Sequence, residues 1–414
     1  MYTRGTMRHL TAAILALLAA QAEWSPTRDE SRAKDLAALG RPFDVYQHDA
    51  KPEWGYKAPQ KDVFVVVHPK ADRKNAPLYV VLHSAGHNVM SCVKCTPEVG
   101  NHDIYRSPDD FYALYVDCAA NRGDWWWGGM HVGDAGLTKK NSGGDLVPAE
   151  RRVIDTVKWV IKTYAIDPDR VYLCGNSMGG SGTLGIGMRH GDVFSAIKAN
   201  VPAGIEHVSQ RMYFAPQTVP ATVKLPDPPV VVDYSAPNDG WSVGHERFVQ
   251  AMNDRKYPLY FYWGPFGHAN NSKVILKVND LIDSFDWLSV RRNEAYAVFT
   301  HASCNSKLPW PDRLKETAPG QVNAFFRWKN VSDAKDKVEM SLFLADLKTS
   351  FDIPAEATAD VSLRRLQNFQ VKPGDSVSWS FGPAKGELQA DAEGVLTFPG
   401  LKMTARPETL TVRR

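Results

Sequence analysis

Between about Asp62 and Val290, short runs of consecutive apolar residues alternate with segments whose apolar residues recur at helical spacing. The runs are rich in Val, Tyr and Leu and are bounded by Pro, Gly or Asp. Continuous apolarity is typical of strands buried on both faces, as in a parallel sheet. The predicted strands are Val63–Val67, Leu78–Leu82, Tyr112–Val116, Val171–Cys174, Val230–Asp233 and Leu259–Trp263.

Helical patterns lie between these strands. The clearest runs from Pro148 to Tyr164, with apolar residues on one face and Pro148 suited to the first turn. Val243–Met252 and Asn279–Trp287 show the same periodicity. Strands that alternate with helices favour an α/β fold built on a doubly wound, mostly parallel sheet.

The pattern changes to β-structure near residue 320. Short apolar runs separated by turn residues such as Pro373–Asp375 follow one another to the end of the chain. The predicted strands are Asn323–Trp328, Val338–Ala345, Ala359–Leu366, Ser376–Phe381 and Leu396–Met403. Several short strands in succession are typical of a small β-sandwich. We therefore expect a connector over residues 291–319 and a β-rich accessory domain over residues 320–414.

The first 22 residues predict an export signal. Arg4 and Arg8 precede the apolar run Leu10–Ala20, and Ala20–Ala22 supplies small residues for cleavage. The run is short for a bilayer, which favours a cleaved signal over an anchor. We expect the mature chain to be secreted or periplasmic, without insertion into the membrane.

Charge and cysteine content restrict the partners. The formal charge is +3, from 49 basic and 46 acidic residues, which gives no electrostatic reason to expect nucleic acid as a partner. Export permits disulfides, so we expect a structural disulfide among Cys92, Cys95 and Cys118, with the pairing left open. We expect a monomer that needs neither a metal nor an organic cofactor.

One motif carries the candidate chemistry. Gly175-x-Ser177-x-Gly179 follows a predicted strand and precedes Ser181–Met188, which can begin a helix. A sharp strand-to-helix turn presents the serine hydroxyl at the edge of the sheet, and the two glycines leave room for the tight backbone approach. The following helix N-terminus favours developing negative charge. We therefore predict that Ser177 is a nucleophile.

A serine nucleophile needs a base and an acid that orients the base. His268 is the predicted base because it lies in the loop after a late strand. Asp239 is the preferred acid, since it lies in the loop past the strand before that. Asp233 and then Glu246 are the alternatives. The chain order of serine, acid and histidine is the one expected for α/β-hydrolases.

An oxyanion hole needs two backbone donors. The amide of Met178 follows the nucleophile, and a second amide is expected from the loop after an early strand. That loop reads His83–His87 and contains small residues. Ala85 is the preferred donor and Ser84 the alternative.

Tryptophans suggest how substrate is held. Three in succession, at 125–127, cannot all enter one core if the segment is extended, so at least one is expected to face a surface or cleft. The alternative is that these tryptophans anchor a large loop. We predict substrate contacts from Trp127, from Trp241 near the candidate acid and from His87. In the tail, either core packing or a sugar-binding platform is open for Trp310, Trp328 and Trp379.

These segments resemble the polysaccharide-esterase branch of the α/β-hydrolases, which includes feruloyl esterases, acetylxylan esterases and polyhydroxybutyrate-depolymerase-like enzymes. The matching stretches are Leu82–Gly86, Ile166–Gly180, Asn238–Asp239 and Gly267–His268. The resemblance covers about residues 60–290, and we expect an α/β-hydrolase catalytic domain over residues 23–290. It also implies hydrolysis of acetyl or feruloyl esters, on a polysaccharide or a small ester substrate, through a covalent acyl-enzyme.

The chain departs from this family at one position. Ser84 stands where the family usually has glycine after the histidine, which leaves the second oxyanion donor open. Two other functions remain as alternatives to an esterase. One is a serine peptidase of the same fold, and the other is a non-catalytic carbohydrate-binding protein on a hydrolase scaffold.

Overall fold

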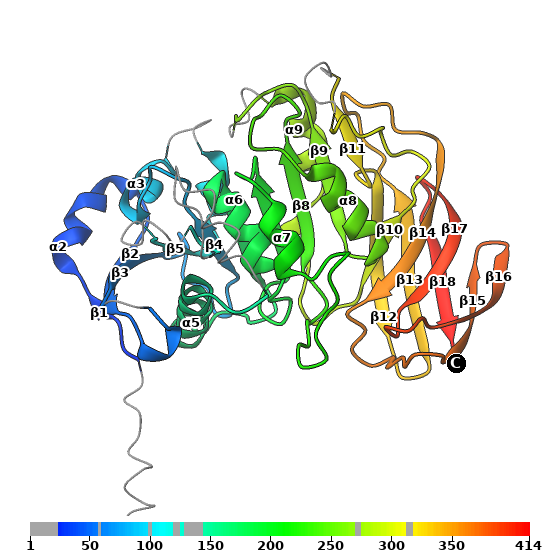
Figure 1. The fold of residues 1–414 in the computed structure, drawn as a ribbon, viewed down its shortest axis with the longest axis horizontal. Coiled ribbons are helices and arrows are strands. Elements are labelled where there is room, and N and C mark those ends of the chain that lie inside the picture. Colours follow the sequence, from blue (N-terminus) through cyan, green and yellow to red (C-terminus); the bar gives the residue numbers. More distant parts are fainter. Residues whose placement is uncertain are drawn as a thin grey trace, which may run out of the picture.

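The computed structural model describes residues 24–56, 59–97, 102–118, 125–127, 144–269, 275–311 and 318–414. The predicted signal segment, residues 1–22, lies outside the described residues. The largest sheet among the described residues, called the central sheet below, has ten strands in the order β1-β2-β3-β5-β4-β6-β7-β8-β9-β11. Figure 1 shows the strands of the C-terminal region beside the end of this sheet formed by β9 and β11.

The central sheet is parallel except at its edges. Neighbouring strands run parallel from β5 through β4, β6, β7 and β8 to β9, whereas β1, β2, β3 and β11 pair antiparallel. This confirms the prediction of a mostly parallel sheet. The strands are β1 (Thr27–Arg28), β2 (Phe43–Asp49), β3 (Lys61–Val67), β4 (Leu78–Leu82), β5 (Tyr112–Val116), β6 (Val171–Asn176), β7 (Ala196–Asn200), β8 (Val230–Ser235), β9 (Leu259–Trp263) and β11 (Gly320–Val322).

Helices cover both faces of this sheet, and a separate apolar core lies under each set. Helices α5, α7 and α8 pack on one face, with alternate strand residues such as Val66 and Val80. Helices α3 and α9 pack on the other face, with Val65 and Val81. Two-sided burial explains the continuous apolar runs. The helices are α2 (Glu30–Ala33), α3 (Val89–Lys94), α5 (Pro148–Thr163), α6 (Met178–Gly182), α7 (Glu206–Arg211), α8 (His245–Asp254) and α9 (Leu276–Asp283).

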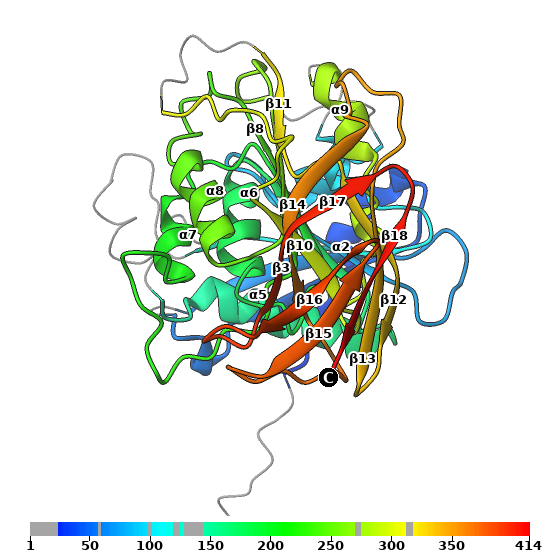
Figure 2. The ribbon, with the colours of Figure 1, turned by 90° about the vertical axis from the view of Figure 1, so that its right-hand side faces the viewer.

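The C-terminal region contains two antiparallel sheets (Figure 2). A three-stranded sheet has the order β10-β14-β17, and a five-stranded sheet has the order β12-β13-β18-β15-β16. Packing of the two as a sandwich stays a prediction. The strands are β10 (Tyr296–Thr300), β12 (Phe326–Asp333), β13 (Lys337–Leu344), β14 (Glu356–Arg364), β15 (Ser376–Phe381), β16 (Ala384–Gln389), β17 (Leu396–Thr404) and β18 (Glu408–Arg413).

Strand pairing crosses the predicted connector in both directions. β10 lies within residues 291–319 but pairs with β14 of the tail. β11, at the start of the predicted accessory region, pairs with β9 of the central sheet. The pairing of β11 with β9 therefore joins the start of the predicted accessory region to the central sheet.

The expected disulfide among Cys92, Cys95 and Cys118 is wrong, because the structure joins none of these residues in a disulfide bond. Cys92 is buried with α3 in the core on one face of the central sheet. Cys118 is buried in the core on the opposite face. The sheet therefore separates these two sulfur atoms. Burial raises the pKa of the Cys92 thiol well above its ordinary value.

None of the helices in the described ranges is long and apolar enough to cross a membrane.

Candidate active site

Ser177 lies at the turn between β6 and α6 with a strained backbone. Its φ is 56° and its ψ is −117°, a region that residues with a Cβ atom rarely adopt. Such a conformation costs of order 1–3 kcal/mol and persists where its surroundings hold it. The amide of Ser177 donates to the carbonyl of Asn200 at 2.9 Å, and its carbonyl accepts from the amide of Ala203 at 3.0 Å. These bonds hold the hydroxyl at the carboxyl end of the parallel strands.

The two glycines of the motif are required by space. A Cβ atom on Gly175 would overlap the backbone of Gly179, and one on Gly179 would overlap the carbonyl of Leu82. The neighbouring atoms are backbone atoms, which cannot rotate away. The turn therefore accepts no larger residue at either position.

Replacing Gly179 with alanine should destabilise the protein by about 3 kcal/mol or more, because relief of the overlap requires β4 to move away from α6. Thermal unfolding followed by circular dichroism would measure the loss. Gly240→Ala is the matched control, since a Cβ atom there meets nothing within 4 Å. An unchanged melting temperature for Gly179→Ala would contradict the close backbone approach.

The structure brings Ser177, His268 and Asp239 together. The Nε2 atom of His268 lies 2.8 Å from the Oγ atom of Ser177, and its Nδ1 atom lies 2.6 Å from Oδ2 of Asp239. The other carboxylate oxygen of Asp239 accepts the amide of Trp241 at 2.9 Å. The carboxylate is buried, whereas the His268 side chain is 34% exposed and open to a substrate.

Asn238 joins the two loops of this relay. Its Oδ1 atom accepts the amide of Gly267 at 2.9 Å, which ties the loop bearing His268 to the loop bearing Asp239. The sequence indicated Asn238 only as part of the family pattern, with no role assigned.

The arrangement supports proton transfer. His268 Nε2 is within hydrogen-bond reach of the serine proton, and Asp239 is placed to orient the ring and to stabilise its charged form. Within the described ranges, no group of three or more His, Cys, Asp or Glu residues is placed to hold a metal ion.

The two alternative acids lie elsewhere. Asp233 is fully buried, and its Oδ2 atom is 3.4 Å from Nε2 of His245, a different histidine. Burial raises the pKa of the Asp233 carboxyl. Glu246 lies in the first turn of α8 and forms an ion pair with Arg247 at 3.6 Å. The structure therefore places Asp239, rather than Asp233 or Glu246, against His268.

The candidate oxyanion donors lie on two segments that pack together. Met178 is the first residue of α6, so its amide has no partner within the helix. The carbonyls of Leu82 and His83, at the end of β4, lie against Gly179, the second residue of α6. The loop after β4 therefore reaches the N-terminus of α6, as an oxyanion hole requires. Whether these amides act as donors stays a prediction.

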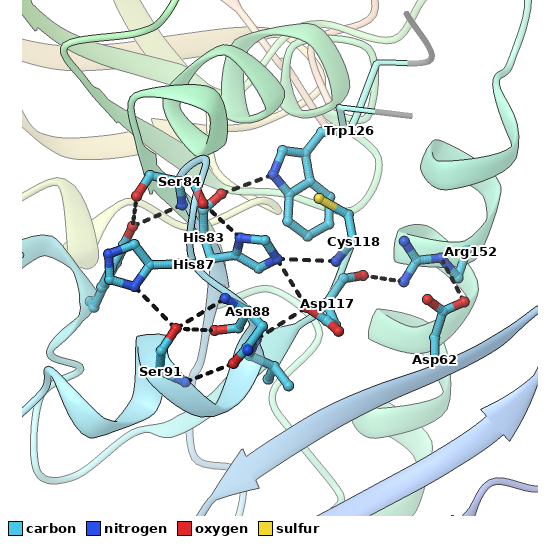
Figure 3. Close-up of polar contacts among 12 residues, drawn as sticks. Asp62, His83, Ser84, His87, Asn88, Ser91, Asp117, Cys118, Trp126 and Arg152 are labelled. Atoms are coloured by element: carbon cyan, nitrogen blue, oxygen red, sulfur yellow. Dashed lines mark hydrogen bonds and ion pairs between the residues drawn. The ribbon is translucent and has the colours of Figure 1, made fainter. Parts of the chain in front are cut away.

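A polar network supports this loop (Figure 3). The carbonyl of His83 accepts the indole N–H of Trp126 at 3.1 Å. The Nε2 atom of His83 lies 3.0 Å from Oδ1 of Asp117. The Asp117 carbonyl in turn accepts Nη1 of Arg152 at 2.6 Å. Sequence patterns singled out none of these roles, because the partners are separated by tens of residues.

The prediction that Trp127 contacts substrate is wrong. All three tryptophans at 125–127 are buried, and Trp127 is 1% exposed. Its ring stacks on His207 with centroids 4.3 Å apart. The assumption of an extended segment fails because Trp125 and Trp126 have positive φ values of 22° and 51°, so the chain turns and all three rings enter the interior.

Trp241 and His87 remain candidates for substrate contact. Trp241 is 39% exposed beside the relay. His87 is partly exposed, and its Nδ1 atom lies 3.2 Å from Oγ of Ser91. The tail tryptophans lie in three different surroundings. Trp310 stacks on His245, Trp328 packs near Tyr260, and Trp379 lines a separate groove of about 370 Å³.

His207 makes the fold sensitive to acid. Burial, with Arg211 nearby, lowers the pKa of His207 to about 3. The unfolded chain therefore takes up a proton near pH 6.5, whereas the folded chain does not. The stabilisation is complete above pH 6.5 and is lost as the pH falls toward 3. About 2 kcal/mol of it is already lost at pH 5.

The variant His207→Phe keeps an aromatic ring beneath Trp127 and should remove this dependence. The difference in unfolding free energy between pH 7 and pH 5 should shrink by about 2 kcal/mol in urea titrations. His301→Gln, at a histidine whose side chain is 66% exposed, is the control and should keep the wild-type difference. If His207→Phe kept the wild-type difference in unfolding free energy between pH 7 and pH 5, the assignment of this acid sensitivity to His207 would be contradicted.

Comparisons with known proteins give a family match over part of the chain and distant similarities among solved structures. The profile of the prolyl oligopeptidase family matches residues 151–214, which include Ser177. No curated protein sequence matches significantly. Among solved structures, the chain is similar to S-formylglutathione hydrolase FrmB of Staphylococcus aureus, with 13% identity over 55% of this chain and 91% of that chain and a TM-score of 0.37.

The chain is also similar to the structures of an S-formylglutathione hydrolase of Agrobacterium tumefaciens and an acetyl xylan esterase of Aspergillus awamori. The first is 12% identical over 63% of this chain and 97% of that chain, with a TM-score of 0.40. The second is 10% identical over 44% of this chain and 69% of that chain, with a TM-score of 0.31.

Proposed function

We propose that this chain is a serine hydrolase that cleaves carboxylic esters through an acyl-enzyme at Ser177. The observation that carries the proposal is the unbroken relay from Ser177 through His268 to Asp239, at 2.8 and 2.6 Å. The strained backbone at Ser177 adds to it, because strain of this kind collects at reactive sites.

The relay supports a two-step reaction. His268 Nε2 takes the proton of Ser177 as Oγ attacks the ester carbonyl, and the amides of Met178 and Ala85 stabilise the oxyanion. The C–O bond breaks, and the alcohol leaves with the proton from His268. Water then gives a proton to His268 and attacks the acyl carbon. The acid leaves, and the Ser177 oxygen recovers its proton.

The proposed substrates are acetyl or feruloyl esters of plant polysaccharides. The resemblance of the motif segments to that branch of esterases supports this choice. The exposed indole of Trp241 beside Asp239 supports it too, because flat aromatic faces bury the apolar faces of sugars or aromatic acids.

We propose that the chain is exported and acts as a secreted or periplasmic monomer, without inserting into a membrane or binding nucleic acid. The apolar N-terminal run and the near-balanced charge support these proposals. Residues 320–414 are proposed to form an accessory β-sandwich, supported by the two antiparallel sheets.

A serine peptidase is the second candidate, favoured by the match of residues 151–214 to the prolyl oligopeptidase family. Release of p-nitrophenol from p-nitrophenyl acetate, beside release of p-nitroaniline from peptide anilides, separates the two. An esterase shows a burst with the acetyl ester and turnover of methyl ferulate or acetylated xylan. Turnover of the anilides with similar efficiency would favour the peptidase, and no turnover of any of them would contradict a hydrolase.

A further inference from the structure

The hydroxyl of Tyr105 contacts the oxyanion loop at two atoms. It accepts the amide N–H of Ser84 at 2.9 Å and donates to Oγ of Ser84 at 3.0 Å. Tyr105 is fully buried, so it does not touch a substrate. Both contacts go to the residue that departs from the family pattern.

Tyr105 is itself held from the central sheet. The hydroxyl of Tyr115 on β5 donates to the carbonyl of Tyr105 at 2.6 Å, and the hydroxyl of Tyr79 on β4 donates to the carbonyl of Ile104 at 2.6 Å. The Tyr105 ring stacks on His102, with centroids 4.9 Å apart and planes 9° from parallel. The phenol therefore has little freedom to leave Ser84.

These contacts fix two successive peptide units. In the unit between His83 and Ser84, the carbonyl accepts from Trp126 at 3.1 Å and the N–H donates to Tyr105 at 2.9 Å. In the unit between Ser84 and Ala85, the carbonyl contacts Nδ1 of His83 at 2.9 Å and the amide of His87 at 3.2 Å. Since a trans peptide is planar, its N–H points opposite to its carbonyl.

The two candidate amides are therefore unequal. The amide of Ser84 is occupied by Tyr105, whereas that of Ala85 has no acceptor among the residues that the structure describes. Ala85 is also exposed. The direction of its N–H follows from the anchored carbonyl of Ser84.

We propose that Tyr105 is a positioning residue that holds the loop after β4 so that Ala85, and not Ser84, donates to the oxyanion. The inference rests on the proposed function and deepens it. It implies that the serine at position 84, where the family usually has glycine, is accommodated because a buried phenol accepts its backbone N–H and donates to its side-chain oxygen.

Tyr105→Phe tests this proposal. Loss of the hydroxyl frees Ser84 and loosens the adjoining peptide, so stabilisation of the transition state should fall while substrate binding stays the same. For p-nitrophenyl acetate we expect kcat to fall at least about 10-fold. The loss should be smaller than the roughly 10²–10³-fold that is typical when an oxyanion-hole donor is removed outright. KM should change less than about 2-fold, and the inhibition constant of phenylboronic acid should rise with the loss in kcat.

Tyr296→Phe is the matched control. It also removes the hydroxyl of a buried tyrosine, but that hydroxyl donates to the carbonyl of Pro228 at 2.5 Å and is not among the contacts that hold Tyr105 or Ser84. Its kcat should stay within about 2-fold of wild type, since distant sites act independently. The proposal is overturned if Tyr105→Phe keeps the wild-type kcat, loses activity only through KM, or is matched by Tyr296→Phe.

Amide hydrogen exchange of the wild-type protein gives a test that depends neither on the folding of a variant nor on turnover. The amide of Ser84 should be protected, and that of Ala85 should exchange fast until phenylboronic acid binds. Fast exchange at Ser84 would by itself refute the proposed hydrogen bond from Ser84 to Tyr105. If the exchange pattern is as expected but no ester is hydrolysed, the proposed function fails, whereas the positioning of the loop by Tyr105 is supported.

Discussion

Replacing Ser177 with alanine should lower kcat for p-nitrophenyl acetate on the order of 10⁵-fold. The reaction depends on a covalent acyl-enzyme, and removal of a serine nucleophile leaves only catalysis by the oxyanion hole and by binding. The burst of p-nitrophenol should disappear. Binding of the ester should persist, because the variant removes one oxygen atom from a turn whose glycines and strands are unchanged.

Stopped-flow absorbance measures both the burst and the steady state. Ser209→Ala, a serine on α7 outside the relay, is the control and should keep wild-type turnover. A burst of normal size in Ser177→Ala would place the nucleophile elsewhere.

Asp239→Asn should lower kcat on the order of 10⁴-fold with little change in the fold. An asparagine amide facing Nδ1 of His268 favours the wrong tautomer, in which Nε2 carries a proton and cannot accept one from Ser177. Oδ2 of Asp239 lies 2.6 Å from Nδ1 of His268, whereas Asp233 pairs with His245 and Glu246 pairs with Arg247.

Asp233→Asn is the matched control for this substitution. Asp233 is buried near His245, outside the relay, so its replacement should affect stability more than catalysis. We expect kcat within about 10-fold of wild type, measured beside the melting temperature. If Asp233→Asn lost as much activity as Asp239→Asn, the acid of the relay would have been misassigned.

Much of the fold could be predicted because its signals are local. β4, β5 and β9 end where their continuous apolar runs end, since strands buried on both faces are mostly apolar. β7 was missed because Lys198 interrupts its apolar run. β2 was missed because its polar and apolar residues mix near the edge of the sheet.

The relay could be predicted because each member follows a strand end. Parallel strands bring their carboxyl ends to one edge, so residues placed after β6, β8 and β9 meet there. The choice between Asp239 and Asp233 needed the structure, because both were predicted from the same strand. Asp233 lies within β8 and faces His245, whereas Asp239 lies in the loop after β8 and contacts His268.

The failures concern contacts that the chain order does not encode. Positive φ values at Trp125 and Trp126 turn a segment that read as extended, which buries Trp127. Cys92 and Cys118 lie on opposite faces of the sheet, and nothing in their spacing shows it. Tyr105 reaches Ser84 from a segment 21 residues away through contacts that leave no motif.

Covalent labelling tests the proposed relay most directly. A fluorophosphonate loses fluoride when a serine oxygen attacks phosphorus, and it reacts quickly only with an activated serine. Tandem mass spectrometry of the labelled wild-type protein should find one adduct, on Ser177, which is absent from His268→Ala under the same conditions. An adduct on another residue, or none in a preparation that hydrolyses esters, would contradict the account.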